Sequence, residues 1–203
     1  MIKENKVIKE FSNWVFPILG AFLIASLINS KVFARVQVQQ SSMENTLYSS
    51  QQLIVDKFNY NFAKPKRGDI IIFLENEQRG TIIDDTVVFV DNIKSIFKST
   101  NNDTDTGKRL VKRIIGIPGD EVNIKDGYVY VNGEKINEPY AKGQTFSDEG
   151  KYPIKVTTNS LFVLGDNRAV SKDSRAFGLI NYKQVEGKAV FRVFPFNKIG
   201  SIK

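Results

Sequence analysis

The sequence predicts an all-β body behind a single N-terminal membrane helix. Three observations lead to this prediction: an uncharged apolar run near the N-terminus, short alternating β-rich segments beyond residue 35, and Asp-Gly and Asn-Gly pairs between such segments. The chain has 203 residues, of which 41% are hydrophobic and 25% charged. About 170 residues remain after the N-terminal segment, which is enough for one domain with a sizeable core.

The apolar run has the length of a transmembrane helix. Residues 11–30 carry no charge, and a helix of about 20 residues spans about 30 Å, the thickness of a bilayer core. A signal peptide cleaved after 32–34 and a buried soluble helix are the alternatives. We expect a retained anchor at 11–33 behind a short tail at 1–10. Three lysines precede the run and two basic residues follow it, which favours an inside N-terminus.

Beyond residue 35 the pattern is typical of β-structure. Strands are predicted where β-branched and aromatic residues dominate, at 35–39, 52–56, 69–73, 160–164 and 188–193. Between 121 and 136, Asp-Gly and Asn-Gly pairs separate three short strands, which predicts a meander with two tight hairpins. Residues 76–108 give no clear pattern, although the apolar stretch 89–97 is a candidate for membrane contact.

The chain contains no histidine and no cysteine, which limits its chemistry. A Ser-His-Asp triad, thiol catalysis and thiolate metal sites are all excluded. No metal or nucleotide cofactor is expected, because His/Cys clusters and Gly-rich phosphate loops are both missing from the sequence. A side-chain nucleophile must then be Ser, Thr or Lys, and lysine is the base that fits best. Ser42 and Lys112 are the candidates, with Ser41 as a rival nucleophile.

Three segments, in this order, resemble type I signal peptidases, the Ser-Lys membrane proteases that cleave signal peptides from exported preproteins. They are 41–47 (SSMENTL), 109–120 (RLVKRIIGIPGD) and 165–178 (GDNRAVSKDSRAFG). The third segment is distinctive by itself, and the order of all three adds to it. The resemblance extends from residue 14 to about residue 200 and is weakest at 76–108 and 137–159.

This resemblance implies a domain organisation and a mechanism. A catalytic β domain would comprise 34–122 and 160–203, with a small β-hairpin subdomain inserted at 123–159. Ser42 would be the nucleophile and Lys112 the general base. A lysine base must be neutral, so burial among apolar side chains has to lower its pKa.

The resemblance also implies supporting roles in the third segment and around the nucleophile. Ser171 would hydrogen-bond to the base and orient it, while Asp173 and Arg175 would form a structural ion pair behind the site. The Ser42 backbone N–H would donate to the oxyanion. Gln40 stands where the family often has a second donor, and its amide either donates or faces solvent. Asn45 replaces the usual proline, a departure that bears on local rigidity rather than on the serine.

Substrate selection would depend on shallow pockets for small side chains, giving an Ala-x-Ala preference. An extended peptide would pair with the strand at 36–40. The family pattern assigns the pockets to apolar residues that otherwise read as ordinary core: Val36, Val38, Leu47, Leu110 and Val111.

The implied partners are secretory preproteins and the lipid bilayer, with a single-pass anchor and the catalytic domain on the extracytoplasmic side of the cell membrane. Three alternatives compete with a peptidase. An autocleaving repressor would need a helix-turn-helix N-terminus, where this chain is apolar. A nucleic-acid-binding β-barrel is allowed by the net charge of +7, but no aromatic-basic strand motif supports it. A membrane-tethered helper in pilin-like surface assembly is compatible with the departures at Gln40 and Asn45. The sequence indicates neither the oligomeric state nor whether the substrates are general or dedicated.

Overall fold

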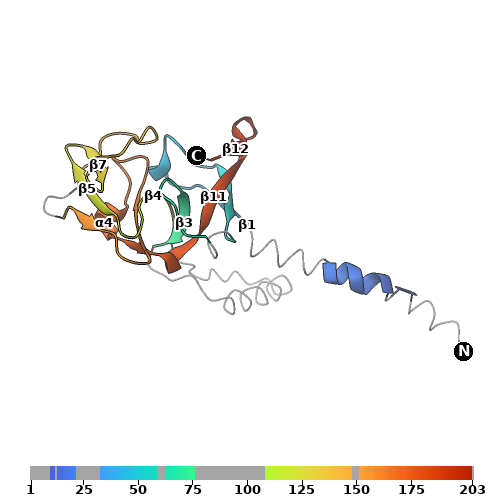
Figure 1. Ribbon diagram of the computed structural model, residues 1–203. Coiled ribbons are helices and arrows are strands. Elements are labelled where there is room, and N and C mark those ends of the chain that lie inside the picture. The colour runs from blue at the N-terminus through green and yellow to red at the C-terminus, as the bar shows by residue number, and fades with distance from the viewer. Residues whose placement is uncertain are drawn as a thin grey trace, which may run out of the picture.

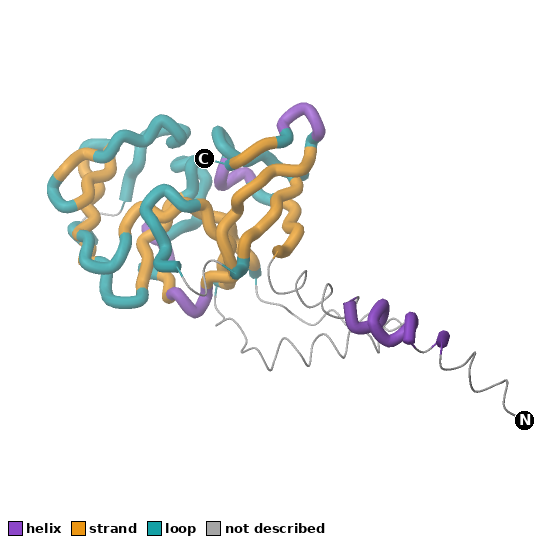
Figure 2. Tube along the Cα trace, turned by 45° about the vertical axis from the view of Figure 1, so that its right-hand side comes forward, coloured by secondary structure: helices purple, strands orange, loops and turns teal. Residues whose placement is uncertain are grey.

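The structure is a computed structural model that describes residues 10–11, 13–21, 33–58, 63–75, 108–147 and 151–202. The predicted β body is confirmed, because the described strands form one eight-stranded and one four-stranded sheet (Figure 1, Figure 2). All strand pairs within the two sheets are antiparallel. This pairing allows short turns to connect neighbouring strands.

The larger sheet comprises β1 (Phe33–Gln37), β2 (Gln52–Asp56), β3 (Ile70–Leu74), β4 (Arg109–Gly116), β9 (Ser160–Leu164), β10 (Ile180–Asn181), β11 (Val185–Phe194) and β12 (Gly200–Ser201). Its order is β1-β2-β11-β3-β4-β9-β10, with β12 beside β11. The predictions at 52–56 and 160–164 coincide with β2 and β9. The other three predicted strands overlap β1, β3 and β11 with shifted ends.

The smaller sheet is the predicted meander extended by one strand. It comprises β5 (Glu121–Lys125), β6 (Tyr128–Val131), β7 (Glu134–Lys135) and β8 (Ile154–Lys155), in the order β7-β6-β5-β8. Asp126 and Gly127 have φ of 51° and 82°, and Asn132 and Gly133 have φ of 55° and 85°. Positive φ at both central residues is the type I′ geometry that suits the strand twist of two-residue hairpins. The two predicted tight hairpins are therefore confirmed.

The two sheets share a hydrophobic core. Strand β4 leads directly into β5, and Ile115 and Phe162 of the larger sheet pack in one cluster with Val122 and Val129 of the smaller sheet. A Cβ on Gly116, where β4 ends, would lie 2.7 Å from the Val122 side chain, so this close approach requires glycine. The predicted border between residues 122 and 123 falls inside β5.

Few helices occur in the described body, as predicted. They are the four-residue α4 (Ser174–Phe177) and the 3₁₀ turns η1 (Ser41–Met43), η2 (Tyr182–Gln184) and η3 (Phe196–Lys198). Helix α4 lies within the 165–178 motif and η1 lies within the 41–47 motif. The two sheets hold the segments that carry these motifs.

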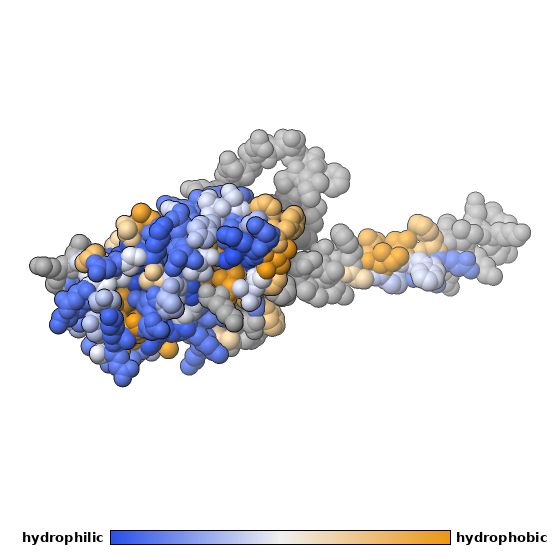
Figure 3. All heavy atoms as spheres, turned by 90° about the horizontal axis from the view of Figure 1, so that it is seen from above, coloured by the Kyte–Doolittle hydropathy of each residue, from blue (hydrophilic) through white to orange (hydrophobic). Residues whose placement is uncertain are grey.

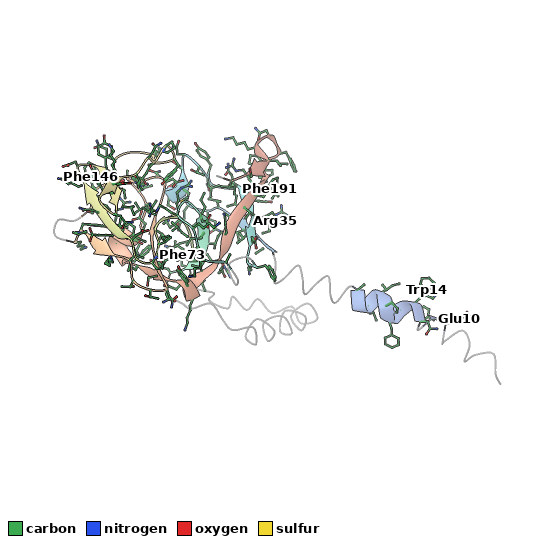
Figure 4. All side chains as sticks on the ribbon, viewed as in Figure 1. Glu10, Trp14, Arg35, Phe73, Phe146 and Phe191 are labelled. Carbon is green, nitrogen blue, oxygen red and sulfur yellow. The ribbon has the colours of Figure 1, made fainter. Side chains whose placement is uncertain are left out.

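Residues 13–21, near the N-terminus, are helical and carry exposed apolar side chains, including Trp14 and Phe16. Figure 3 shows hydrophobic residues gathered on this helix, and Figure 4 labels Trp14 on it. No helix within the described residues is both long and apolar enough to span a bilayer. Much of the expected anchor, namely residues 12 and 22–32, lies outside the described residues, as do 76–107 with their apolar stretch.

Candidate active site

Ser42 lies in the 3₁₀ turn η1 that follows strand β1. The connection from β1 to β2 is closed by two backbone hydrogen bonds, Val38 N–H to the Gln51 carbonyl at 2.9 Å and Ser50 N–H to the Val38 carbonyl at 2.8 Å. Met43, next to the serine, is buried in the core of this part of the larger sheet. The buried Met43 side chain holds the turn in place, and this fixes the position of the neighbouring serine.

Lys112 reaches Ser42 from the middle of strand β4. Its Nζ donates to Ser42 Oγ at 2.7 Å, and only 1% of the lysine is exposed. Ile71 faces Lys112 in the β3–β4 register, and both Ile71 and Ile114 are fully buried. The apolar surroundings that a lysine base requires are therefore present.

Burial has a direct electrostatic consequence for Lys112. Loss of solvation disfavours the ammonium form and lowers the pKa of Lys112 from 10.5 to about 8, although the charges of Asp173 and Glu75 oppose the shift. A lysine with this pKa holds much more neutral amine near physiological pH than an exposed one. The pair thus has a hydroxyl within reach of a group able to accept its proton.

Ser171 differs from the expectation in one respect. Its Oγ is buried and has no hydrogen-bond partner among the described residues, so the expected bond to Lys112 is not formed. The Lys112 Nζ is directed at Ser42 Oγ instead. Ser171 still lies beside the site, since a Cβ built on Gly165 would come within 2.2 Å of Ser171 Oγ and 2.5 Å of the Ser42 carbonyl oxygen.

The ion pair expected between Asp173 and Arg175 is present. Arg175 donates from Nε to Asp173 Oδ1 at 2.8 Å and from Nη2 to Oδ2 at 2.9 Å. Asp173 also caps α4 by accepting from the Arg175 backbone N–H, and it accepts from the Gly165 N–H at 3.0 Å. One buried carboxylate therefore joins the helix start to the strand end beside the site.

Asn167 contacts the nucleophile turn directly, which the sequence did not reveal. Its backbone N–H donates to the Ser42 carbonyl at 3.0 Å, and its side-chain amide donates to the Ser41 carbonyl at 3.2 Å. Its place in the distinctive 165–178 segment was the available signal.

Arg113 is a second residue that sequence reasoning missed. It follows Lys112 directly, but its guanidinium forms a buried bidentate pair with Asp166, at 2.9 and 2.8 Å. Thr46 hydrogen-bonds to both partners of this pair. Strand β4 thus supplies Lys112 and, with the next residue, a buried anchor for the far end of the turn that carries Ser42.

A groove of about 620 Å³ runs between β1 and β4 and includes Ser42 in its lining. Val36, Val38 and Val111 line this groove as expected, and the exposed Gln40 lines it beside the serine. Leu47 and Leu110 do not line it, which corrects the expectation. Leu47 packs in the core with Met43. Leu110 lies on the opposite face of β4 from Val111, because successive strand side chains alternate.

Comparisons with known proteins identify the family of the chain. A sequence model of the family described as "Signal peptidase, peptidase S26" matches residues 11–194. Signal peptidase I of Bacillus licheniformis is 35% identical over 210 residues, covering 98% of this chain and 98% of that protein. Signal peptidase IB of Staphylococcus aureus (strain Mu50 / ATCC 700699) is 31% identical over 206 residues, covering 94% and 93%.

Among solved structures, a signal peptidase I from Enterococcus faecalis V583 is 29% identical and covers 62% of this chain and 96% of its own, with a TM-score of 0.41. The family model and the curated relatives define the chain as a serine endopeptidase. It belongs to the signal peptidase family, peptidase S26, whose activity is the cleavage of signal peptides.

Proposed function

We propose that this chain is a membrane-anchored endopeptidase that removes signal peptides from exported preproteins with a Ser42–Lys112 dyad. The observation that carries the proposal is the 2.7 Å contact between Lys112 Nζ and Ser42 Oγ, made by a lysine that is 1% exposed. A buried lysine is costly to charge. A buried position therefore suits a lysine whose neutral amine accepts a proton.

The proposed reaction proceeds in two halves. Ser42 Oγ attacks the carbonyl carbon before the cut while Lys112 Nζ accepts the hydroxyl proton. The tetrahedral intermediate collapses with breakage of the C–N bond, and the protonated Nζ gives its proton to the departing amine. Nζ then takes a proton from water as the water oxygen attacks the acyl carbon, and it gives this proton to Ser42 Oγ when the acyl C–O bond breaks, which regenerates both residues.

We assign oxyanion stabilisation to the Ser42 backbone N–H and to the Gln40 side-chain amide. Gln40 lines the groove and its side chain makes no capping bond to η1, so the amide is available to a substrate carbonyl. Ser171 is assigned to orienting Lys112. The support for this role is that the Ser171 hydroxyl is buried beside Gly165 and the Ser42 carbonyl. This hydroxyl has no hydrogen-bond partner among the described residues.

We propose that residues 11–33 form a single-pass anchor that leaves the body on the extracytoplasmic side. The uncharged run 11–30 and the exposed Trp14 and Phe16 on helix 13–21 support the anchor. Alkaline washing should leave the full chain in the membrane pellet, and protease added to intact spheroplasts should digest the body. Recovery of the chain in the soluble fraction would contradict the anchor.

Cleavage of a purified preprotein in detergent tests the dyad. Ser42→Ala and Lys112→Ala should each lose at least about a thousandfold in rate. Ser41→Ala is the matched control, because it removes a neighbouring hydroxyl while keeping the turn, and it should retain wild-type activity. Full activity of Ser42→Ala, or loss confined to Ser41→Ala, would refute the assignment.

A further inference from the structure

The groove beside Ser42 carries an excess of positive charge. Its described lining includes four basic residues, Arg35, Lys57, Lys108 and Arg109, and a single acidic one, Glu186. Glu186 is engaged with Arg109 at 2.9 Å. Glu75 lies near enough to interact with Lys108 electrostatically but forms its ion pair with Lys172.

Lys57 and Lys108 make no ion pair with any described residue. Arg35, labelled on strand β1 in Figure 4, hydrogen-bonds to the neutral Gln52 and keeps its charge uncompensated. The net charge of the lining is therefore positive, and three of its cations are available to a ligand.

Lys57 and Lys108 lie toward the end of the groove that is remote from the serine, whereas Arg35 reaches Gln52 opposite the serine-side end of β1. In the β1–β2 register Phe33 faces Asp56, so Lys57 adjoins the start of β1, whereas Ser42 follows its end. Lys108 precedes β4 and is four residues before Lys112, a separation of about 13 Å along an extended chain. A bound extended peptide would bring residues about four to six positions before the cut to this charged end.

The apolar residues between the cations and Ser42 indicate which side of the cut a bound substrate presents to the cations. Val36, Val38 and Val111 line that intervening part of the groove, where the proposed pockets for the small residues before the cut lie. The charged end is therefore opposite the segment that precedes these small residues. An anionic lipid headgroup has the matching charge but not the extended shape, so a peptide carboxylate is the better occupant.

We propose that the cationic end of this groove selects preproteins with an acidic side chain about four to six residues before the cut and disfavours a basic one there. This inference rests on the proposed function and specifies its substrate class. Partly exposed charges interact modestly, so several cations together should discriminate acidic from basic substrates about tenfold.

Soluble peptides test the proposal with the full chain in neutral detergent. Peptides that share an Ala-x-Ala site and carry Glu, Gln or Lys at each of the three upstream positions are compared by kcat/KM. At one position or more, Glu should exceed Lys about tenfold, with Gln between them, and 0.5 M NaCl should reduce the ratio to about threefold or less. Equal kcat/KM values for Glu and Lys at all three positions would overturn the proposal.

Two charge-matched double variants identify the source of the preference. Lys57→Gln/Lys108→Gln should reduce the Glu-to-Lys ratio to about threefold or less. Lys64→Gln/Lys155→Gln removes the same charge from exposed positions outside the groove and should keep the wild-type ratio. An unchanged ratio in the groove variant, or a preference that arises only with anionic vesicles, would overturn the proposal.

A binding measurement separates this inference from the proposed function. Ser42→Ala cannot cleave through Ser42, so fluorescence anisotropy with this variant reports the affinities for the Glu and Lys peptides directly. Failure of the wild type to cleave any peptide would contradict the proposed function, while the affinity ratio would still decide the charge preference. Equal affinities would overturn the preference even if every peptide is cleaved.

Discussion

Lys112 Nζ lies 2.7 Å from Ser42 Oγ, although the two residues are 70 positions apart in the sequence. Strand β4 holds the lysine beneath the 3₁₀ turn that carries the serine, and the surrounding aliphatic side chains exclude water from the amine. The contact therefore depends on the packing of two distant segments. The protonation state of Lys112 is the property of this contact that is easiest to measure.

The activity should rise with pH through the lowered pKa of Lys112. That pKa is about 8, and only the neutral amine can accept the Ser42 proton. The rate should therefore fall about tenfold for each pH unit below this pKa and level off above it. Measurement of kcat/KM on one preprotein from about pH 6 to about pH 10 checks this. A rate that declines across the neutral range as pH rises would exclude Lys112 as the base.

Restoring the family's usual proline at Asn45 should damage this protein. Asn45 has φ of 93° and donates its side-chain amide to the Tyr140 carbonyl at 3.0 Å, whereas proline fixes φ near −65°. Asn45→Pro should therefore lower the free energy of unfolding by about 2 kcal/mol or more and reduce kcat/KM. Thermal unfolding and peptide cleavage provide the two readouts.

The matched control is Asn45→Gly, because glycine adopts positive φ without strain. It should lose only the bond to Tyr140, about 1 kcal/mol, and retain most activity. A proline variant as stable and active as the wild type would show that the protein does not require a positive φ at residue 45.

An added methyl group at Gly165 should disable the site. A Cβ there would lie 2.2 Å from Ser171 Oγ and 2.5 Å from the Ser42 carbonyl oxygen, which forces the nucleophile turn to move. Gly165→Ala should lower kcat/KM at least about a hundredfold, since displacements of about 1 Å are costly in catalysis. Gly200→Ala is the control, because nothing lies within 4 Å of its Cβ, and it should cleave normally.

Adding Ser171→Gly to Gly165→Ala distinguishes the two clashes. The second change removes the contact with Ser171 Oγ but leaves the contact with the Ser42 backbone. It also removes the hydroxyl proposed to orient Lys112, so the reference is Ser171→Gly alone, and the double variant should be less active than that reference. Activity equal to that of Ser171→Gly alone would show that the serine side chain alone causes the loss. Wild-type activity in Gly165→Ala itself would mean that the turn adapts to the methyl group.

Removing Arg175 should destabilise the body. The Asp173 side chain is 0% exposed, and Arg175 neutralises it through two hydrogen bonds. Loss of one partner from a buried pair costs about 3–5 kcal/mol, so Arg175→Ala should shift urea unfolding to much lower midpoints. Lys125→Ala breaks the exposed pair with Asp126, whose side chain is 72% exposed, and should change the midpoint little. Equal shifts for both variants would contradict a structural role for the buried pair.

Residue types and their order along the chain were enough to predict the class of chemistry and much of the local structure. The lack of histidine and cysteine limited a side-chain nucleophile to serine, threonine or lysine, and three ordered motifs pointed to Ser42, Lys112 and the Asp173–Arg175 ion pair. Asp-Gly and Asn-Gly set the two hairpins because these residues tolerate positive φ. Each of these features depends on residue type or on neighbours close in the chain.

The contacts between distant segments and the direction of each side chain could not be predicted before the folded chain was seen. Asn167 binds the Ser42 carbonyl, and Leu110 packs in the core while Val111 lines the groove. The lowered pKa of Lys112 likewise arises from burial by strands far apart in the sequence. Strand register, facing and desolvation are properties of the packed sheets, so no local pattern of residues contains them.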